Sequence, residues 1–236
     1  MNLFKIFTLY LIDLLRNHFH QPRILKFLTK LNLRIAFDIG SHKGETLEYF
    51  QKIKNIKKIH AFEPQIFIYK KLVDKYNSNK NIILNNVALS NNSEEKIFYY
   101  NSLSSTSSFS LLNKNSFWLK IKNFILNEKN LIKNSIIIKT STVDDYVINN
   151  NIGMIDLLKI DTEGHELEVL IGAQKTIDKK KINYVLLEIH TSKMYKNYSK
   201  EKIEEFLKKN NFILLKSFKF PFLAFKDNIY KHNGIN

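Results

Sequence analysis

One stretch near the amino terminus constrains the fold of this chain more than any other. It reads Ile35-Ala36-Phe37-Asp38-Ile39-Gly40-Ser41-His42-Lys43-Gly44-Glu45-Thr46, an apolar run followed by a turn with two glycines. Gly40 allows a sharp turn, and Gly44 allows the next helix to begin close to the strand or to a ligand. The free N–H groups of such a helix can bind a carboxylate or a phosphate. The stretch predicts the strand-turn-helix unit that opens a nucleotide pocket in an α/β sheet.

The spacing of the two glycines separates two classes of ligand. Dinucleotide sites carry G-x-G-x-x-G, whereas this turn reads D-x-G-x-x-x-G, with His42 where a middle glycine would stand. A side chain there disfavours the close backbone approach that a pyrophosphate needs. The pattern fits a smaller nucleoside ligand such as S-adenosylmethionine. An ordinary strand-turn-helix without a ligand stays open as the alternative.

Composition indicates one domain of ordinary size. The chain has 236 residues, 44% of them hydrophobic, with only 6 glycines and 3 prolines from which linkers could be made. This length is enough for an α/β domain with a substantial core. Cysteine is absent, which rules out disulfides and thiolate metal sites and suits a reducing cytoplasm.

The formal net charge of +15 raises the question of an anionic partner. Nucleic acids and anionic membranes are the usual partners of such chains. The lysines, however, are spread along the sequence, and arginine occurs only at Arg16, Arg23 and Arg34. Because arginine is the main base-reading residue, we expect no nucleic-acid partner.

Residues 1–31 are apolar and basic, and we predict an N-terminal helical extension over residues 1–33. Lys5 and Asp13 interrupt a short apolar run, so no membrane-spanning helix is expected. No small-residue cleavage site follows, so no secretory signal is expected either. Two interpretations remain, a helix packed on the domain and a helix lying on a membrane surface. Both need the same amphipathic face, and we favour the packed helix.

Strands and helices alternate from Arg34 onward. Helical spacing over Glu45–Lys52 and after Pro64 follows the first two strands, and proline suits the first helical position. This alternation favours a mostly parallel sheet, and the tight join between the last two strands requires them to pair antiparallel. The predicted strands are Arg34–Asp38, Lys57–Phe62, Asn81–Asn86, Ile155–Ile160, Ile182–Ile189, Phe212–Ser217 and Pro221–Lys226.

The alternation breaks around residues 96–139, where we predict an insertion. Strands over Lys96–Tyr100 and Ser135–Lys139 bracket a serine-rich loop, Ser102–Ser110, and a helical stretch, Asn113–Asn130. Insertions beside a pocket often form substrate lids. A solvated decoration without function stays open as the alternative.

Four carboxylates lie at the carboxyl ends of predicted strands, the edge of the sheet where ligands bind. Glu63 comes at the end of the second strand, 63 − 44 = 19 residues beyond Gly44. A carboxylate there can accept hydrogen bonds from both hydroxyls of a ribose. The alternative is a carboxylate that stabilises the start of the next helix. Asp161 can face an acceptor hydroxyl as a base, or cap a helix. Glu163 and His190 are the other catalytic candidates. Asp161, Glu188 and His190 could also hold a divalent metal.

Several motifs together resemble the FkbM-type methyltransferases in order and spacing, over roughly residues 34–226. They are Phe37-Asp38-Ile39-Gly40-Ser41-His42-Lys43-Gly44, Ala61-Phe62-Glu63-Pro64, Asn86-Val87-Ala88-Leu89-Ser90, Val143-Asp144-Asp145-Tyr146, the block from Ile155 to Glu166, and Leu187-Glu188-Ile189-His190. His42 is a departure, since the family more often has asparagine there.

The resemblance implies a class I methyltransferase fold. This is a Rossmann-like α/β fold with a mostly parallel sheet and an antiparallel closing strand, here with N-terminal helices and a β-hairpin/helix insertion. Residues 34–236 would form the domain that binds S-adenosylmethionine. By resemblance, Asp38, Gly40 and Gly44 hold the methionine end, Glu63 the ribose, and Asn86 to Ala88 the adenine. The expected cofactor residues are Asp38, Gly40, Ser41, His42, Gly44, Thr46, Glu63, Asn86, Val87 and Ala88.

The expected activity is O-methylation of a sugar, glycan or secondary metabolite by direct transfer from S-adenosylmethionine. Asp161 or His190 would remove or orient the hydroxyl proton. We expect a cytoplasmic enzyme, with membrane contact through residues 1–31 left open. Two rivals remain, a dinucleotide-dependent oxidoreductase and a non-catalytic scaffold of the same fold at a membrane surface.

Overall fold

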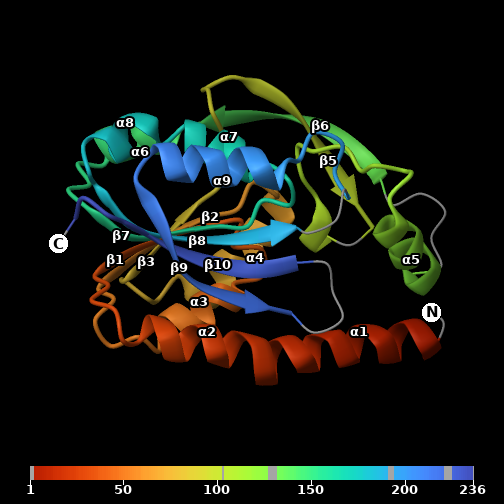
Figure 1. The fold of residues 1–236 in the computed structure, drawn as a ribbon. Coiled ribbons are helices and arrows are strands. Elements are labelled where there is room, and N and C mark those ends of the chain that lie inside the picture. The colour runs from red at the N-terminus through yellow and green to blue at the C-terminus, as the bar shows by residue number, and fades with distance from the viewer. Residues whose placement is uncertain (1–2, 103, 127–131, 191–193, 221–224, 236) are drawn as a thin grey trace.

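A twisted sheet between two layers of helices forms the body of the protein (Figure 1). The computed structural model describes residues 3–102, 104–126, 132–190, 194–220 and 225–235. In this part of the chain seven strands lie in the order β3-β2-β1-β7-β8-β10-β9. The strands are β1 (Ile35–Ile39), β2 (Lys58–Phe62), β3 (Ile82–Asn85), β7 (Ile155–Ile160), β8 (Ile182–His190), β9 (Phe212–Lys219) and β10 (Phe225–His232).

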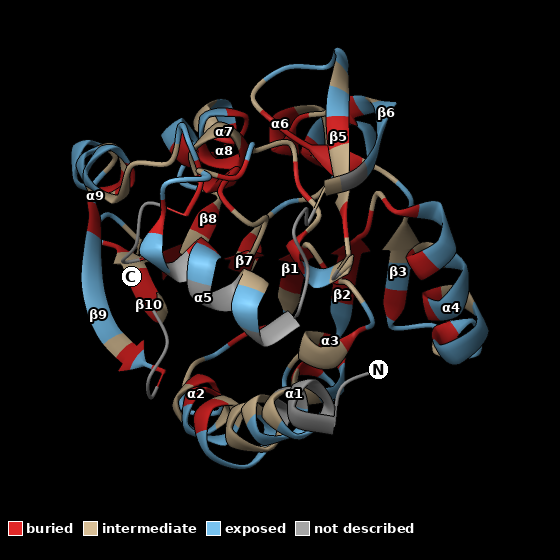
Figure 2. Ribbon diagram, turned by 90° about the vertical axis from the view of Figure 1, so that its right-hand side faces the viewer, coloured by how far each residue is buried: buried red, intermediate tan, exposed pale blue. Residues whose placement is uncertain are grey.

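The pairing of these strands confirms the mostly parallel sheet with an antiparallel closing strand. The pairs β1–β2, β2–β3, β1–β7 and β7–β8 are parallel. Strand β10 pairs antiparallel with both β8 and β9. The carboxyl ends of β1, β2, β7 and β8 therefore meet at one edge of the sheet. Figure 2 looks onto this edge, with the buried central strands lying between the helical layers.

Helices cover both faces of the sheet because its strands alternate their side chains between two cores. On β1, Phe37 and Ile39 enter one core and Ala36 the other. The first core lies under α6 (Val143–Asn149), α7 (Glu166–Ile171), α8 (Gln174–Asp178) and α9 (Lys200–Lys209). The second lies under α2 (Gln21–Leu28), α3 (Glu45–Phe50) and α4 (Ile66–Tyr76).

The predicted N-terminal helix is present as one continuous rod. It consists of α1 (Leu3–Leu15), a π-helical turn η1 (Arg16–His20) and α2. Ile24 and Leu28 of α2 are buried against the sheet, so this end is packed, as favoured from the sequence. Helix α1 extends past the strand ends toward α5 (Figure 1). Among the described helices, none combines the length and the apolar character that a membrane span requires.

The predicted insertion is also confirmed. Strands β5 (Glu95–Asn101) and β6 (Ile132–Ser141) pair antiparallel, with the 3₁₀ turn η2 (Ser104–Thr106) and helix α5 (Phe117–Leu126) between them in sequence. A short strand that was not predicted, β4 (Ala88–Leu89), pairs with β6 and joins the insertion to the main domain. In Figure 2, α5 crosses in front of the carboxyl edge.

Several boundaries differ from the sequence prediction. Helix α4 begins at Ile66 with Gln65 as its N-cap, so Pro64 precedes the helix. The helix predicted over 113–130 is observed as α5, and residues 127–130 lie outside the described part. The last strand was predicted over 221–226 but is observed as β10, with 221–224 also outside. Buried polar residues Asp227 and Asn228 hid the strand pattern. Asp227 meets His20 from far away in sequence, and Asn228 donates its amide to the hydroxyl of Tyr230.

Candidate active site

The turn after β1 is fixed by its contact with the end of β7. Gly40 and Gly44 both have φ of +84°, a conformation that favours glycine. A Cβ on Gly40 would lie 1.9 Å from the backbone oxygen of Asp161. Asp161 in turn donates its N–H to the carbonyl of Ile39 at 3.0 Å. The glycine turn and Asp161 are therefore direct neighbours at the carboxyl edge.

Glu63 lies on the other side of the same turn. Its Oε2 accepts the N–H of His42 at 2.9 Å, and its Oε1 accepts the N–H of Gln65 at 2.8 Å. The side chain is buried, and burial raises the pKa of Glu63 despite the two backbone donors. His42 has φ of +45°, which turns its N–H toward the carboxylate. The turn thus holds Glu63 in one orientation.

The remaining expected cofactor residues lie around this edge. Ser41 ties β1 to β2, since its Oγ donates to the carbonyl of Asp38 at 2.7 Å and accepts the N–H of Phe62 at 3.1 Å. Asn86 donates its side-chain amide to the carbonyl of Glu63 at 2.8 Å. Val87 is half-buried and Ala88 opens β4. These contacts fix the edge, while their role toward a cofactor stays a prediction.

Asp38 is fully buried and faces a cation. The Nζ of Lys159 lies 2.9 Å from its Oδ1, and 3.4 Å from Oδ2 of Asp161. Burial raises the pKa of Asp38, and the neighbouring lysine counteracts this. The sequence left open whether Lys159 neutralises a carboxylate or points to solvent. The structure shows that it joins the two aspartates beneath the glycine turn.

Asp161 and Glu188 are neighbouring carboxyls with opposite pKa shifts. Burial disfavours the charged form of Asp161, but the cations of Lys159 and Arg16 hold its pKa below the usual range. Burial raises the pKa of Glu188 well above its usual range, and the charges of Asp161 and Glu163 add to this. Asp161 is therefore the ionised group that can accept a proton, and Glu188 favours its protonated form.

Three carboxylates converge at the ends of β7 and β8. One oxygen from each of Asp161, Glu163 and Glu188 lies within 4.8 Å of the others. The sequence grouped His190, not Glu163, with the other two as metal ligands. The structure places His190 Nε2 3.9 Å from an oxygen of both Glu163 and Glu188. An oxygen-rich group of this kind suits a hard divalent cation.

Two tyrosines position His190 and Glu163. The hydroxyl of Tyr198 accepts the backbone N–H of His190 at 2.9 Å, and the ring of Tyr195 lies 5.2 Å from the imidazole. Tyr195 also donates its hydroxyl to Glu163. A Cβ on Gly164 would lie 2.6 Å from the Tyr195 ring, so glycine makes room for it. Sequence reasoning missed both tyrosines, because nothing in their spacing marks them.

Arg16 and His20 of the N-terminal helix were also missed. Arg16 places a guanidinium nitrogen 3.9 Å from Oδ2 of Asp161. His20 is buried and its Nε2 lies 2.6 Å from Oδ2 of Asp227 on β10. Thr46, Arg16 and Asp161 line a cavity of about 20 Å³, room for about one water. The helix therefore closes this side of Asp161, and the π-turn aims both side chains inward.

The serine-rich loop lies over the same edge. Ser104 Oγ is 2.8 Å from Nε2 of His42, and its carbonyl accepts the amide of Gln65 at 3.2 Å. Ser108 donates to the carbonyl of Thr162 at 3.0 Å, and Ser110 to that of Gly164 at 2.7 Å. The loop bridges the tips of β1, β2 and β7. It is thus attached to the site rather than being a free decoration.

The strand order, the glycine turn and the acidic residues at the strand tips define a class I methyltransferase fold. The Methyltransferase FkbM domain matches residues 38–214 of this chain. The chain therefore belongs to the FkbM methyltransferase family, as its motifs indicated. No curated protein matches it with significant similarity.

Solved structures share the fold at low identity. Methyltransferase FkbM from Methylobacillus flagellatus KT is 15% identical with a TM-score of 0.52, over 85% of this chain and 43% of that protein. This chain thus spans less than half of that protein. TrmK from M. capricolum, solved with S-adenosylhomocysteine, is 12% identical with a TM-score of 0.50, over 89% and 67%. The methyltransferase domain of bacterial CtHen1-CN is 9% identical with a TM-score of 0.51, over 93% and 99%.

Proposed function

We propose that this protein transfers a methyl group from S-adenosylmethionine to a hydroxyl of a sugar, glycan or secondary metabolite. One observation carries the proposal. The turn at Gly40 lies between Glu63 and Asp161, since Gly40 donates its N–H to the carbonyl of Phe62 at 3.1 Å and its Cα faces the backbone of Asp161. A carboxylate suited to ribose and an ionised acceptor carboxylate therefore flank one glycine turn.

The donors already on Glu63 leave it free to bind a ribose. A carboxylate has about four acceptor positions, and the backbone of His42 and Gln65 occupies one on each oxygen. Two positions remain for two hydroxyls, and the existing bonds hold the group rigidly. Asn86, Val87 and Ala88 follow on the next strand tip, where an adenine edge would lie. The residues present thus fit an adenosyl group.

The acceptor hydroxyl would lie against Asp161. When bound, S-adenosylmethionine supplies an electrophilic methyl group. Asp161 accepts the hydrogen of the acceptor hydroxyl, and Lys159 and Arg16 keep this carboxylate ionised. His190 is the second candidate for the proton, held in place by Tyr198. The chain's main contribution is orientation, with the proton acceptor adding to it.

The serine-rich loop is proposed to hold the acceptor in place. Its bonds from Ser104 to His42 and from Ser110 to Gly164 reach both the cofactor side and the acceptor side. A segment attached at both points closes over the strand tips and excludes water. Opening it requires breaking the bonds of three serine hydroxyls and the bond from the Gln65 amide to the Ser104 carbonyl, at about 1 kcal/mol each.

Transfer of labelled methyl groups tests the proposal. The purified protein is incubated with methyl-labelled S-adenosylmethionine and panels of sugars, glycans, small hydroxylated metabolites and RNA, with and without a chelator. We expect label in an ether methyl of a hydroxylated acceptor, and its loss in Asp161→Asn. Label on a nitrogen of RNA would contradict the acceptor class. Binding of NAD in place of an adenosyl ligand would favour an oxidoreductase, and binding of neither would favour a scaffold.

A further inference from the structure

We propose that the outer face of the N-terminal helix docks on an anionic membrane surface. The proposal rests on the rod formed by α1, η1 and α2, and is independent of the methyl-transfer reaction. The outer face of this rod consists of Phe7, Tyr10, Leu11, Phe19, Arg23 and Lys26.

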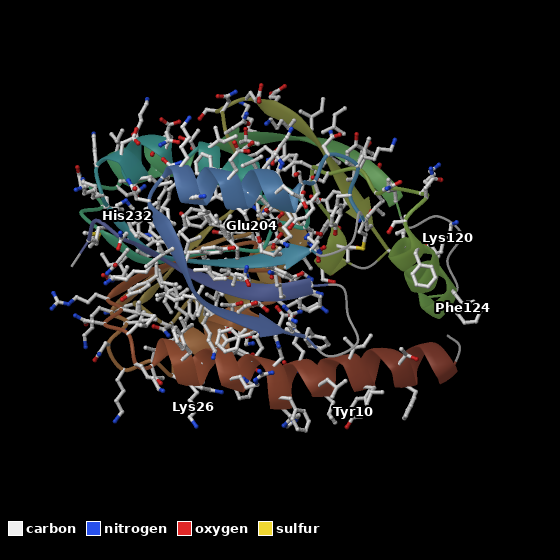
Figure 3. All side chains as sticks on the ribbon, viewed as in Figure 1. Tyr10, Lys26, Lys120, Phe124, Glu204 and His232 are labelled. Carbon is white, nitrogen blue, oxygen red and sulfur yellow. The ribbon has the colours of Figure 1, made fainter. Side chains whose placement is uncertain are left out.

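The inner side of the rod fixes which residues face outward. Arg16, His20, Ile24 and Leu28 follow one another at a spacing of four, and they reach Asp161, β10 and the core. Residues on the opposite side of this stretch cannot contact the sheet. Figure 3 shows Tyr10 and Lys26 projecting from the same outer side of the rod, away from the strands.

The first half of the outer face is apolar and exposed. Phe7 and Tyr10 each have 63% of their surface in solvent, Leu11 has 44% and Phe19 has 57%. Phe7, Tyr10 and Leu11 share a face through their spacing of three and four. At the π-turn Gln21 donates its N–H to the carbonyl of Arg16, the i→i+5 bond of a π-helix. Phe19 lies in this turn and is exposed as well.

The second half of the outer face is basic. Arg23 and Lys26 are exposed and follow Phe19 at spacings of four and seven. Residues 1–31 contain five lysines and arginines and one acidic residue, Asp13. None of the described helices is long and apolar enough to cross a bilayer. Aromatic side chains in line with cations are typical of helices that lie in the membrane interface.

The positive charge of the chain favours an anionic membrane over a second copy of this chain as the partner of the outer face. The whole chain has a net charge of +15, so two copies meeting through a basic face would repel each other. An anionic lipid surface complements Arg23 and Lys26, and it also accepts the aromatic rings beside them. A nucleic acid would use the cations but would leave the row of Phe7, Tyr10 and Leu11 in water. The membrane is the occupant that uses both halves.

Co-sedimentation of the full chain with vesicles tests the proposal. The two compositions are phosphatidylcholine alone and an equimolar mixture with phosphatidylglycerol. We expect binding to the anionic vesicles, weakened by salt, and little binding to the neutral ones. In Arg23→Gln/Lys26→Gln the partition coefficient should fall about 30-fold, which is about 2 kcal/mol at about 1 kcal/mol per basic residue. In Phe19→Ser it should fall about tenfold.

Helix α4 offers matched controls on another face. It exposes Phe67, Lys70 and Lys71, so Lys70→Gln/Lys71→Gln and Phe67→Ser remove the same charge and the same ring. Both should bind vesicles as the wild type does. All of these side chains are exposed, and each variant should keep the wild-type melting temperature.

Three results would overturn the proposal. The first is an absence of wild-type binding to anionic vesicles at low salt. The second is an equal loss in the α4 controls, which would mean that net charge alone drives binding. The third is a different occupant of the outer face, seen as binding of single-stranded RNA without vesicle binding, or as a dimer in sedimentation velocity that Phe19→Ser dissociates.

Discussion

The ammonium group of Lys159 lies 2.9 Å from Oδ1 of Asp38, in the interior of the sheet beneath the glycine turn. Burial alone would lower the pKa of this lysine, but the charges of Asp38 and Asp161 raise it above the usual range. The cation therefore balances two carboxylates at once. Asp38 lies beneath the turn, and Asp161 is the carboxylate that we propose for the acceptor side.

Replacing Lys159 by methionine should destabilise the protein strongly. The change leaves the buried Asp38 without its cation, and loss of one partner of a buried pair costs about 3–5 kcal/mol. Urea unfolding measures the difference from the wild type. Lys159→Met/Asp38→Asn should recover much of the loss, because it removes the stranded charge as well. A single variant that unfolds at the wild-type urea concentration would show that the pair contributes little.

Removing the charge of Arg16 should shift the pH profile of methyl transfer. Arg16 helps to hold the pKa of Asp161 low, so in Arg16→Gln this pKa rises and the acidic limb of the rate profile moves to higher pH. The guanidinium is one third exposed, and solvent screening keeps the shift below about one pH unit. Arg23→Gln, on the outer side of the same helix, serves as the control. Identical acidic limbs in both variants would show that Arg16 does not lower the pKa of Asp161.

His20 and Asp227 should be energetically coupled across the join between the N-terminal helix and β10. Their side chains are buried and 2.6 Å apart, and residues in such contact show coupling of about 0.5–3 kcal/mol. Unfolding free energies of His20→Ala, Asp227→Ala and the double variant give this value. Limited proteolysis within residues 1–31 should be faster in all three. Additive effects would mean that the helix is held by its apolar side chains alone.

The buried His165 should make the protein less stable in acid. Burial, aided by Lys96, lowers the pKa of His165 to about 3, against about 6.5 in an unfolded chain. The imidazole therefore binds a proton at a lower pH in the folded state than in the unfolded state. The free energy of unfolding therefore has its full value above pH 6.5, with respect to this histidine, and decreases as the pH falls toward 3.

Urea unfolding at several pH values measures this decline. Two pH units below 6.5, one such histidine accounts for about 2–3 kcal/mol. His165→Gln keeps a group that can hydrogen-bond to Ser90 Oγ, which lies 2.9 Å from the imidazole, and should show a flatter profile between pH 7 and 4.5. Parallel profiles for the two proteins would place the acid sensitivity elsewhere.

The sequence predicted the sheet well where local periodicity was strong. Strand β7 was predicted with its observed bounds, Ile155–Ile160, because apolar residues fill four of its six positions. The gathering of Glu63 and Asp161 beside Gly40 followed from strand polarity alone, since parallel strands end at one edge. These features depend on neighbours in sequence and on general rules of topology.

Long-range contacts were beyond what the sequence pattern could predict. His20 meets Asp227 across 207 positions, and no local spacing signals such a pair. The same contact explains the misplaced last strand, because Asp227 looks solvent-exposed until a histidine is known to cover it. Arg16 reaches Asp161 from a π-turn, which the helical spacing did not indicate. Contacts of this kind need the fold itself.

Calorimetric titration of S-adenosylhomocysteine tests the central claim most directly. If Glu63 binds the ribose, Glu63→Gln should lower the affinity at least about 100-fold, since it weakens two charge-assisted hydrogen bonds of about 1.5–3 kcal/mol each. Asp161→Asn should bind within about threefold of the wild type, because we propose that this residue contacts the acceptor and not the cofactor. Undiminished affinity in Glu63→Gln would contradict the account.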